Sequence, residues 1–120
     1  MSNRSKKICI VDDSKFMRSI LIGILKSAGF NNFIECENGR ECLQICKNDS
    51  PDLILLDIIM DGTDGMQVLK SIGSSVNIIV ISAMSHDEIM NKAKKLGAKG
   101  YIVKPFNQNQ VLNEINKIFG

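Results

Sequence analysis

The sequence predicts an α/β fold in which five parallel strands form one open, doubly wound sheet. Short apolar runs alternate along the chain with segments whose apolar residues follow the period of a helix. Strands that alternate with helices form a parallel sheet covered on both faces, and right-handed crossovers favour the doubly wound arrangement. With 120 residues, 44% hydrophobic and 23% charged, the chain has the size and composition of one globular domain, which we expect over residues 1–120.

The first half of the chain is predicted to contain three strands and two helices. Apolar runs typical of buried parallel strands occupy residues 8–11, 33–36 and 53–56. Ser14 is the predicted cap of the first helix, and Gly29 ends it. One apolar stripe of that helix is formed by Met17, Ile20, Leu21, Ile24, Leu25 and Ala28. The second helix is predicted over residues 38–47, with Cys42 among its inward residues.

The second half is predicted to complete the sheet. A polar, glycine-rich loop over residues 57–65 precedes a short helix with Met66, Val68, Leu69 and Ile72 on its apolar face. Strands follow at residues 77–81 and 101–103, separated by a helix over residues 87–96 that Gly97 ends. The last helix carries the apolar stripe Val111, Leu112, Ile115, Ile118 and Phe119.

Composition excludes several classes of protein. Fifteen basic and thirteen acidic residues give a net charge of +2. A charge this small does not indicate binding to nucleic acid or to an anionic membrane. No apolar run is long enough to span a bilayer, and the polar first residues do not resemble a signal peptide, so we expect a cytoplasmic protein. Free buried thiols are the expected state of the four cysteines, because no CxxC pair supplies zinc-ligand spacing.

Candidate functional residues follow the predicted strands. In an open α/β sheet, ligands bind beyond the carboxyl ends of the strands. Asp12 and Asp13 follow the first strand, Asp57 the third, Ser82 the fourth, and the Lys104–Pro105 pair the fifth. Only the second strand contributes no such group, as expected if it lies at an edge of the sheet. A dinucleotide fold needs glycines after its first strand, so the two carboxylates at that turn disfavour nucleotide binding.

These residues predict phosphoryl transfer. Three carboxylates in one crevice require a cation, and oxygen ligands open to water suit Mg²⁺. Asp57 is the central carboxylate and a possible nucleophile that would form an acyl phosphate. Ser82 offers a hydroxyl and Lys104 a point charge for phosphoryl oxygens.

The segments Ile8–Ser14, Leu55–Asp57, Ser82–Ala83 and Val103–Phe106 together resemble the receiver domain of two-component response regulators, in the family's order and spacing over nearly the whole chain. The resemblance implies a flavodoxin-like (βα)5 fold and a signalling switch instead of an enzyme. It implies that a histidine kinase phosphorylates Asp57.

The resemblance also assigns roles around the acceptor. Asp13, Asp57 and the Ile59 carbonyl would bind Mg²⁺ directly, with Asp12 acting through water or from just outside the ligand set. Ser82 and Lys104 would bind the phosphoryl group. Tyr101 would be the aromatic residue whose rotamer reports phosphorylation, and the Lys104–Pro105 peptide bond would be cis. The downstream target would bind the face formed by the fourth helix, fifth strand and fifth helix.

One position departs from the family pattern, and two others occupy sites at which the family varies its rate of dephosphorylation. Asp61 stands four residues past the acceptor, where the family often has proline. Ile59 and Met84 occupy the two positions that commonly modulate dephosphorylation, and both are apolar.

Other functions remain open at this point. A haloacid-dehalogenase-like phosphatase also uses a nucleophilic aspartate, but after its first strand and with a second acid two residues on, where this chain has Ile59. Among receivers, the chain is a single-domain chemotaxis-type regulator, a phosphorelay intermediate or a receiver cut from a larger protein. Residues 12–18 and 82–84 resemble chemotaxis regulators of the CheY type most.

Overall fold

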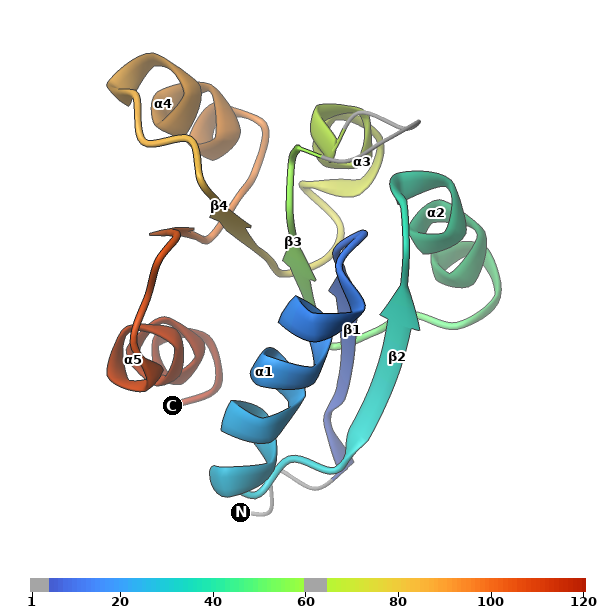
Figure 1. Cartoon of the computed structure of the whole chain (residues 1–120). Coiled ribbons are helices and arrows are strands. Elements are labelled where there is room, and N and C mark those ends of the chain that lie inside the picture. Colours follow the sequence, from blue (N-terminus) through green and yellow to red (C-terminus); the bar gives the residue numbers. More distant parts are fainter. Residues whose placement is uncertain (1–4, 60–64) are drawn as a thin grey trace.

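The computed structural model describes residues 5–59 and 65–120, in which strands and helices alternate along the chain (Figure 1). The elements are β1 (Lys7–Val11), α1 (Lys15–Ser27), β2 (Asn32–Cys36), α2 (Gly39–Asn48), β3 (Leu53–Leu56), α3 (Gly65–Ile72), β4 (Ile78–Ser82), α4 (Asp87–Lys95), β5 (Gly100–Val103) and α5 (Gln108–Phe119). The predicted fold class is confirmed, and the predicted bounds are shifted at most by a few residues at each end.

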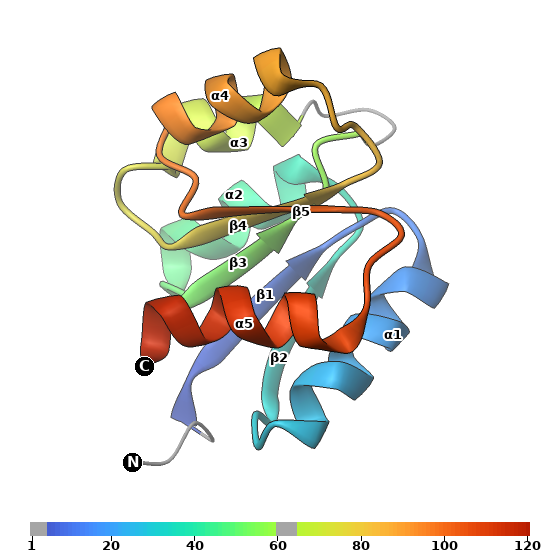
Figure 2. The ribbon, with the colours of Figure 1, turned by 90° about the vertical axis from the view of Figure 1, so that its left-hand side faces the viewer.

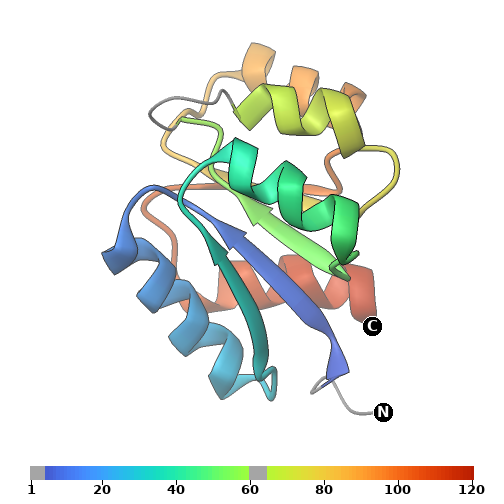
Figure 3. The ribbon, with the colours of Figure 1, turned by 90° about the vertical axis from the view of Figure 1, so that its right-hand side faces the viewer.

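The five strands form one parallel sheet in the order β2-β1-β3-β4-β5. The second strand therefore lies at an edge, as predicted. Helices α1 and α5 cover one face of the sheet, and α2, α3 and α4 cover the other (Figure 2). The opposite view shows α2 and α3 side by side above the strands, with α1 and α5 below them (Figure 3). This is the doubly wound arrangement that right-handed crossovers produce.

The sheet separates the core into two hydrophobic clusters, because successive strand side chains point to opposite faces. Cys9 and Val11 of β1 pack under α2, α3 and α4, whereas Ile8 and Ile10 pack with α1 and α5. The central strands β1, β3 and β4 are buried almost throughout. A rigid apolar sheet of this kind holds the polar residues at its carboxyl edge in fixed positions.

Helix α1 corrects one sequence prediction. Periodicity predicts Ile20 on the apolar stripe, but it is 36% exposed, and the residues that α1 buries are Arg18, Leu21 and Leu25. The rest of the predicted stripe still packs against the core, including Met17, Ile24 and Ala28. Arg18, which the stripe does not include, is also buried, because its guanidinium donates hydrogen bonds to Glu35 and to the Asp12 carbonyl.

Local signals fix where the helices begin and end. The Ser14 hydroxyl accepts a hydrogen bond from the Met17 N–H at 3.2 Å, and Gly97 follows α4 with a φ of 112°, a conformation that favours glycine. Gly65 begins α3 so close to β3 that an added Cβ would lie 2.7 Å from the Asp57 carbonyl oxygen. The start of α3 is therefore packed directly against the strand end that carries Asp57.

The four cysteines are free thiols, and Cys9, Cys36 and Cys42 are fully buried. The sulfurs of Cys9 and Cys36 lie 3.5 Å apart. Cys46 is half-buried, and burial raises the pKa of its thiol to about 12. None of the helices in the described part of the chain has the length and apolar character that a bilayer span requires.

Candidate functional site

The acidic residues that follow β1 and β3 meet at the carboxyl edge of the sheet. The two strands are neighbours, with Val11 paired to Leu56, and the Asp57 N–H donates to the Val11 carbonyl at 3.0 Å. Carboxylate oxygens of Asp12, Asp13 and Asp57 all lie within 4.8 Å of one another. Within residues 5–59 and 65–120, this is the one group of three or more acidic, histidine or cysteine side chains close enough to share a metal ion.

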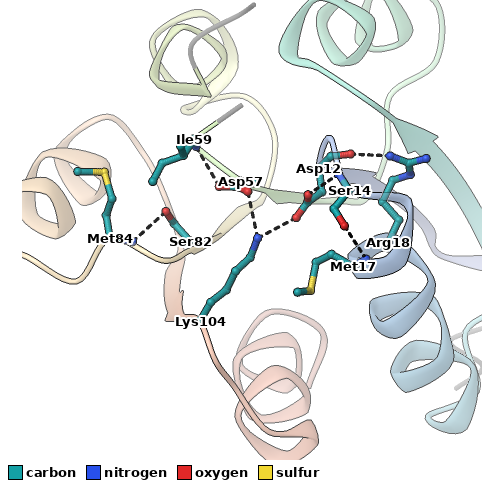
Figure 4. A network of polar contacts seen from close by, with 9 residues as sticks. All are labelled: Asp12, Ser14, Met17, Arg18, Asp57, Ile59, Ser82, Met84 and Lys104. Atoms are coloured by element: carbon teal, nitrogen blue, oxygen red, sulfur yellow. Dashed lines mark hydrogen bonds and ion pairs between the residues drawn. The ribbon is translucent and has the colours of Figure 1, made fainter. Parts of the chain in front are cut away.

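Lys104 joins the acidic residues from the end of β5. Its Nζ donates to Asp12 Oδ2 and to Asp57 Oδ2, both at 3.0 Å (Figure 4). The Lys104 N–H donates to the Ser82 carbonyl at 2.8 Å, which fixes the start of this side chain beside β4. The Lys104–Pro105 peptide bond is cis. One ammonium group thus partly neutralises two carboxylates from two other strands.

Burial and charge oppose each other at these groups. Asp57 is 6% exposed, and burial raises its pKa despite the Ile59 N–H and the Lys104 ammonium, which both lower it. Burial alone would lower the pKa of Lys104, but its bonds to Asp12 and Asp57 raise it overall. The charged form of the Asp57 carboxylate is therefore only partly compensated by its neighbours, and an added cation would stabilise it.

The donor set fits a hard divalent cation. Asp12 is 2% exposed and Asp13 is exposed, so the cluster has a buried side and a side open to water. Mg²⁺ prefers a few carboxylate oxygens and retains several waters, which matches this half-open cluster. The Ile59 N–H donates to Asp57 Oδ1 at 2.9 Å and holds that carboxylate in place. Asp61 and Asp64 lie outside the described residues.

Ser82 and Tyr101 form a second group of polar contacts, around Met84. The Met84 N–H donates to the Ser82 hydroxyl at 3.2 Å, and the Tyr101 hydroxyl donates to the Met84 carbonyl at 2.7 Å. Ser82 is fully buried, and burial raises the pKa of Tyr101. Between described residues, no side-chain hydrogen bond links Ser82 or Tyr101 to Asp57 or Lys104.

Arg18 is the residue at this site that sequence reasoning missed. Figure 4 shows its guanidinium beside Asp12, where it donates a hydrogen bond to the carbonyl oxygen of this aspartate. Its position in α1, four residues after the Ser14 cap, places it at the strand end, and a charged residue among apolar helix positions is the signal that could have found it.

The chain matches the family model described as "Response regulator receiver domain" over residues 8–116. It therefore belongs to the response regulator receiver domain family. The family places this chain among signalling domains, which agrees with the strand-end cluster and not with the phosphatase alternative.

Within that family the chain is similar to chemotaxis proteins. It is 41% identical over 114 residues to the chemotaxis protein CheY of Bacillus subtilis, covering 92% of this chain and 95% of the relative. It is 39% identical over 116 residues to CheY of Thermotoga maritima, covering 94% and 97%. The structure of a CheX–CheY–BeF3–Mg complex from Borrelia burgdorferi matches with a TM-score of 0.90 and 32% identity, covering 96% of this chain and 90% of the other.

Proposed function

We propose that this receiver domain is a single-domain, chemotaxis-type switch that accepts a phosphoryl group from a histidine kinase on Asp57. One observation carries the proposal: the buried Asp57 carboxylate lies beside two further carboxylates and 3.0 Å from the Lys104 ammonium. Similarity to CheY proteins across nearly the whole length of both chains supports the chemotaxis type. A phosphorelay intermediate or a receiver segment of a larger regulator is the alternative.

The transfer step uses groups that the chain holds in place. An Asp57 carboxylate oxygen attacks phosphorus in line with the leaving group, and a new O–P bond forms as the N–P bond of a phosphohistidine breaks. The imidazole leaves with the electron pair and takes a proton from water. The Lys104 ammonium then neutralises charge on the phosphoryl oxygens, and the Ser82 hydroxyl donates a hydrogen bond to one of them. The domain assists its own phosphorylation and dephosphorylation and turns over no other substrate.

Mg²⁺ is the proposed cofactor. Asp13, Asp57 and the Ile59 carbonyl would hold it, with Asp12 nearby. When bound, the ion neutralises charge between the carboxylates and the incoming phosphoryl oxygens. The Borrelia burgdorferi complex combines a CheY protein with Mg and BeF3, which supports the same choice of ion for this chain.

The signal would pass through Ser82 to Tyr101. A phosphoryl group on Asp57 attracts the Ser82 hydroxyl, which now accepts from Met84, and thereby opens space toward which Tyr101 turns. The Tyr101 hydroxyl is hydrogen-bonded to the Met84 carbonyl, so the Met84 backbone contacts both the Ser82 and the Tyr101 side chains. The downstream protein would then bind the face formed by α4, β5 and α5.

The charge of this face defines the proposed downstream partner. Four exposed lysines lie on α4 and just after it, namely Lys92, Lys94, Lys95 and Lys99. A shallow groove of about 540 Å³ between β5 and α5 includes Tyr101 and Lys117. An acidic partner segment is the complementary occupant.

Intact-mass analysis tests the acceptor. With Mg²⁺ and acetyl phosphate, the wild-type protein is expected to gain one phosphate, and Asp57→Asn is expected to gain none. Lys104→Ala should keep part of the labelling and lose signalling, because it removes a group that reads the phosphoryl charge. Asp52→Asn, which changes a carboxylate at the opposite end of β3, is the matched control and should label normally. Labelling that persists in Asp57→Asn would reject Asp57 as acceptor.

Amide NMR tests the output face. Addition of Mg²⁺ and beryllofluoride, which mimics the phosphoryl group, is expected to shift amides of α4, β5 and α5. If amides around Asp57 move and that face does not, the proposed route through Tyr101 is wrong.

A further inference from the structure

Arg18 is a charged side chain in the hydrophobic interior. It is 6% exposed and lies on the buried face of α1, where Leu21 and Leu25 pack against the sheet. A buried cation is costly unless it is paired and hydrogen-bonded, so its partners indicate what it does.

The two partners of Arg18 lie in the turn that follows β1 and on strand β2. Its Nη1 donates to the Asp12 carbonyl at 2.7 Å, and its Nε donates to Glu35 Oε1 at 2.9 Å. Glu35 stands on β2, the edge strand, and its side chain is 46% exposed. The Arg18 guanidinium therefore links the backbone of the β1–α1 turn to the neighbouring strand.

The carbonyl and both carboxylate oxygens of Asp12 accept hydrogen bonds. Its carbonyl accepts from Arg18, one carboxylate oxygen accepts from the Ser14 N–H at 2.9 Å, and the other accepts from Lys104. Of these bonds, the one from Arg18 is the contact that anchors the peptide between Asp12 and Asp13. Loss of that anchor would free the turn that carries both carboxylates.

We infer that Arg18, oriented by Glu35, is a positioning residue that pre-arranges Asp12 and Asp13 for the divalent cation. The inference rests on the proposed function, because the cation is part of that proposal. Arg18 does not touch the ion or the reacting atoms. It acts by fixing the backbone between two acidic ligand candidates, as groups behind metal ligands do in general.

Electrostatics and positioning predict opposite signs for loss of Arg18. A cation beside a metal site repels the metal ion. If the effect of Arg18 were purely electrostatic, the protein without Arg18 would bind Mg²⁺ more tightly. An arginine that positions the carboxylates would weaken Mg²⁺ binding when removed. Glu35 neutralises the guanidinium in the native structure, which leaves the positioning effect dominant.

Isothermal titration of Mg²⁺ into the full chain, with no phosphodonor, measures the effect. Arg18→Met keeps the aliphatic stem and is expected to raise the Kd about tenfold, the lower end of the range for residues behind metal ligands. Arg18→Lys keeps the charge but cannot donate to Glu35 and to the Asp12 carbonyl in the geometry of the guanidinium. Its Mg²⁺ affinity should therefore lie between those of Arg18→Met and the wild type. Glu35→Gln is expected to weaken binding about threefold, because it unmasks the cation and loosens its orientation.

The controls separate positioning from folding. Lys7→Met breaks the ion pair with Asp49 at the opposite end of β1 and should leave the Kd unchanged. Each variant is also unfolded in urea, and Kd values are compared only for folded protein. Unchanged or tighter Mg²⁺ binding by Arg18→Met would overturn the inference while leaving the proposed function standing. A wild-type protein that binds no Mg²⁺ would overturn both.

Discussion

The two sides of the candidate site are organised in different ways. The acidic side consists of Asp12, Asp13, Asp57 and Lys104, and three of these residues are joined by charged hydrogen bonds of 3.0 Å. The hydroxyl side consists of Ser82, Met84 and Tyr101, joined by neutral hydrogen bonds through the Met84 backbone. Charge-assisted hydrogen bonds are roughly twice as strong as neutral ones, so the acidic side resists rearrangement more than the hydroxyl side.

This difference matches the proposed division of labour. A phosphoacceptor needs carboxylates and an ammonium group already in place, because positioning supplies much of the rate of phosphoryl transfer. A switch needs an element whose two arrangements differ little in free energy. The predictions below test whether the acidic side is held by charge and whether the hydroxyl side is the part that moves.

Removal of the central ammonium group should have the largest effect. Lys104→Met leaves the nearly buried Asp12 and Asp57 carboxylates without their shared cation, and we expect a loss of about 3 kcal/mol in the free energy of unfolding. Urea denaturation measures it, and Mg²⁺ should restore part of the loss. Lys117→Met removes an exposed pair with Glu114 and should change stability by less than about 0.5 kcal/mol. Equal effects of the two substitutions would mean that charge does not hold the acidic side together.

The lifetime of the phosphorylated protein should change next most. Hydrolysis requires a water in line with the Asp57–phosphorus bond, and the apolar Ile59 and Met84 offer no group to orient it. Ile59→Asn and Met84→Glu should each accelerate decay by roughly one to two decades, because one positioning hydrogen bond in a transition state contributes about 1–3 kcal/mol.

Decay of the labelled protein, followed by intact mass, checks this lifetime. Ile20→Asn, which replaces an exposed isoleucine of α1, should decay at the wild-type rate. Unchanged or slower decay in both test variants would mean that these two positions do not control access of water.

Stability should depend on pH through Asp57. Burial raises the folded pKa of this acid above its ordinary value of 3.8, so folding favours the protonated form. The contribution of protonated Asp57 to the free energy of unfolding is fully present below pH 3.8. It is lost as the pH rises through the pKa of Asp57 in the folded protein.

Without Mg²⁺, Asp57→Asn should therefore stabilise the protein near pH 7 by about 1–2 kcal/mol, a few degrees in Tm, and the gain should vanish below that pH window. Thermal unfolding across pH checks the difference, with the exposed Glu37→Gln as reference. A gain that is the same at every pH would show that ionisation of Asp57 is not its cause.

The smallest effect is expected on the hydroxyl side. Tyr101→Phe removes one neutral hydrogen bond to the Met84 carbonyl and should cost about 1 kcal/mol. Amide shifts should concentrate near Met84, and the Mg²⁺ affinity should stay at the wild-type value. A changed affinity would mean that the two sides are coupled before phosphorylation.

The sequence predicts the strand-end residues well because a parallel sheet brings the carboxyl ends of its strands together. Asp12 and Asp57 follow runs that are buried almost completely, and the register of β1 and β3 then places them side by side. The same reasoning fails for α1. Periodicity places Ile20 inside, but it is exposed, and it does not predict that Arg18 is buried, because the partners that stabilise a buried charge come from the β1–α1 turn and from β2. Such partners are known only once the chain has folded.

The cysteines have a practical consequence for spectroscopic work on this protein. Three thiols are fully buried, and the half-buried Cys46 has a pKa of about 12, so little of it is thiolate near neutral pH. Maleimides and similar reagents attack through the thiolate, and the native thiols should therefore react slowly. A single new cysteine on the exposed surface of α4 would take up a fluorophore selectively and report on the proposed output face without prior removal of the native cysteines.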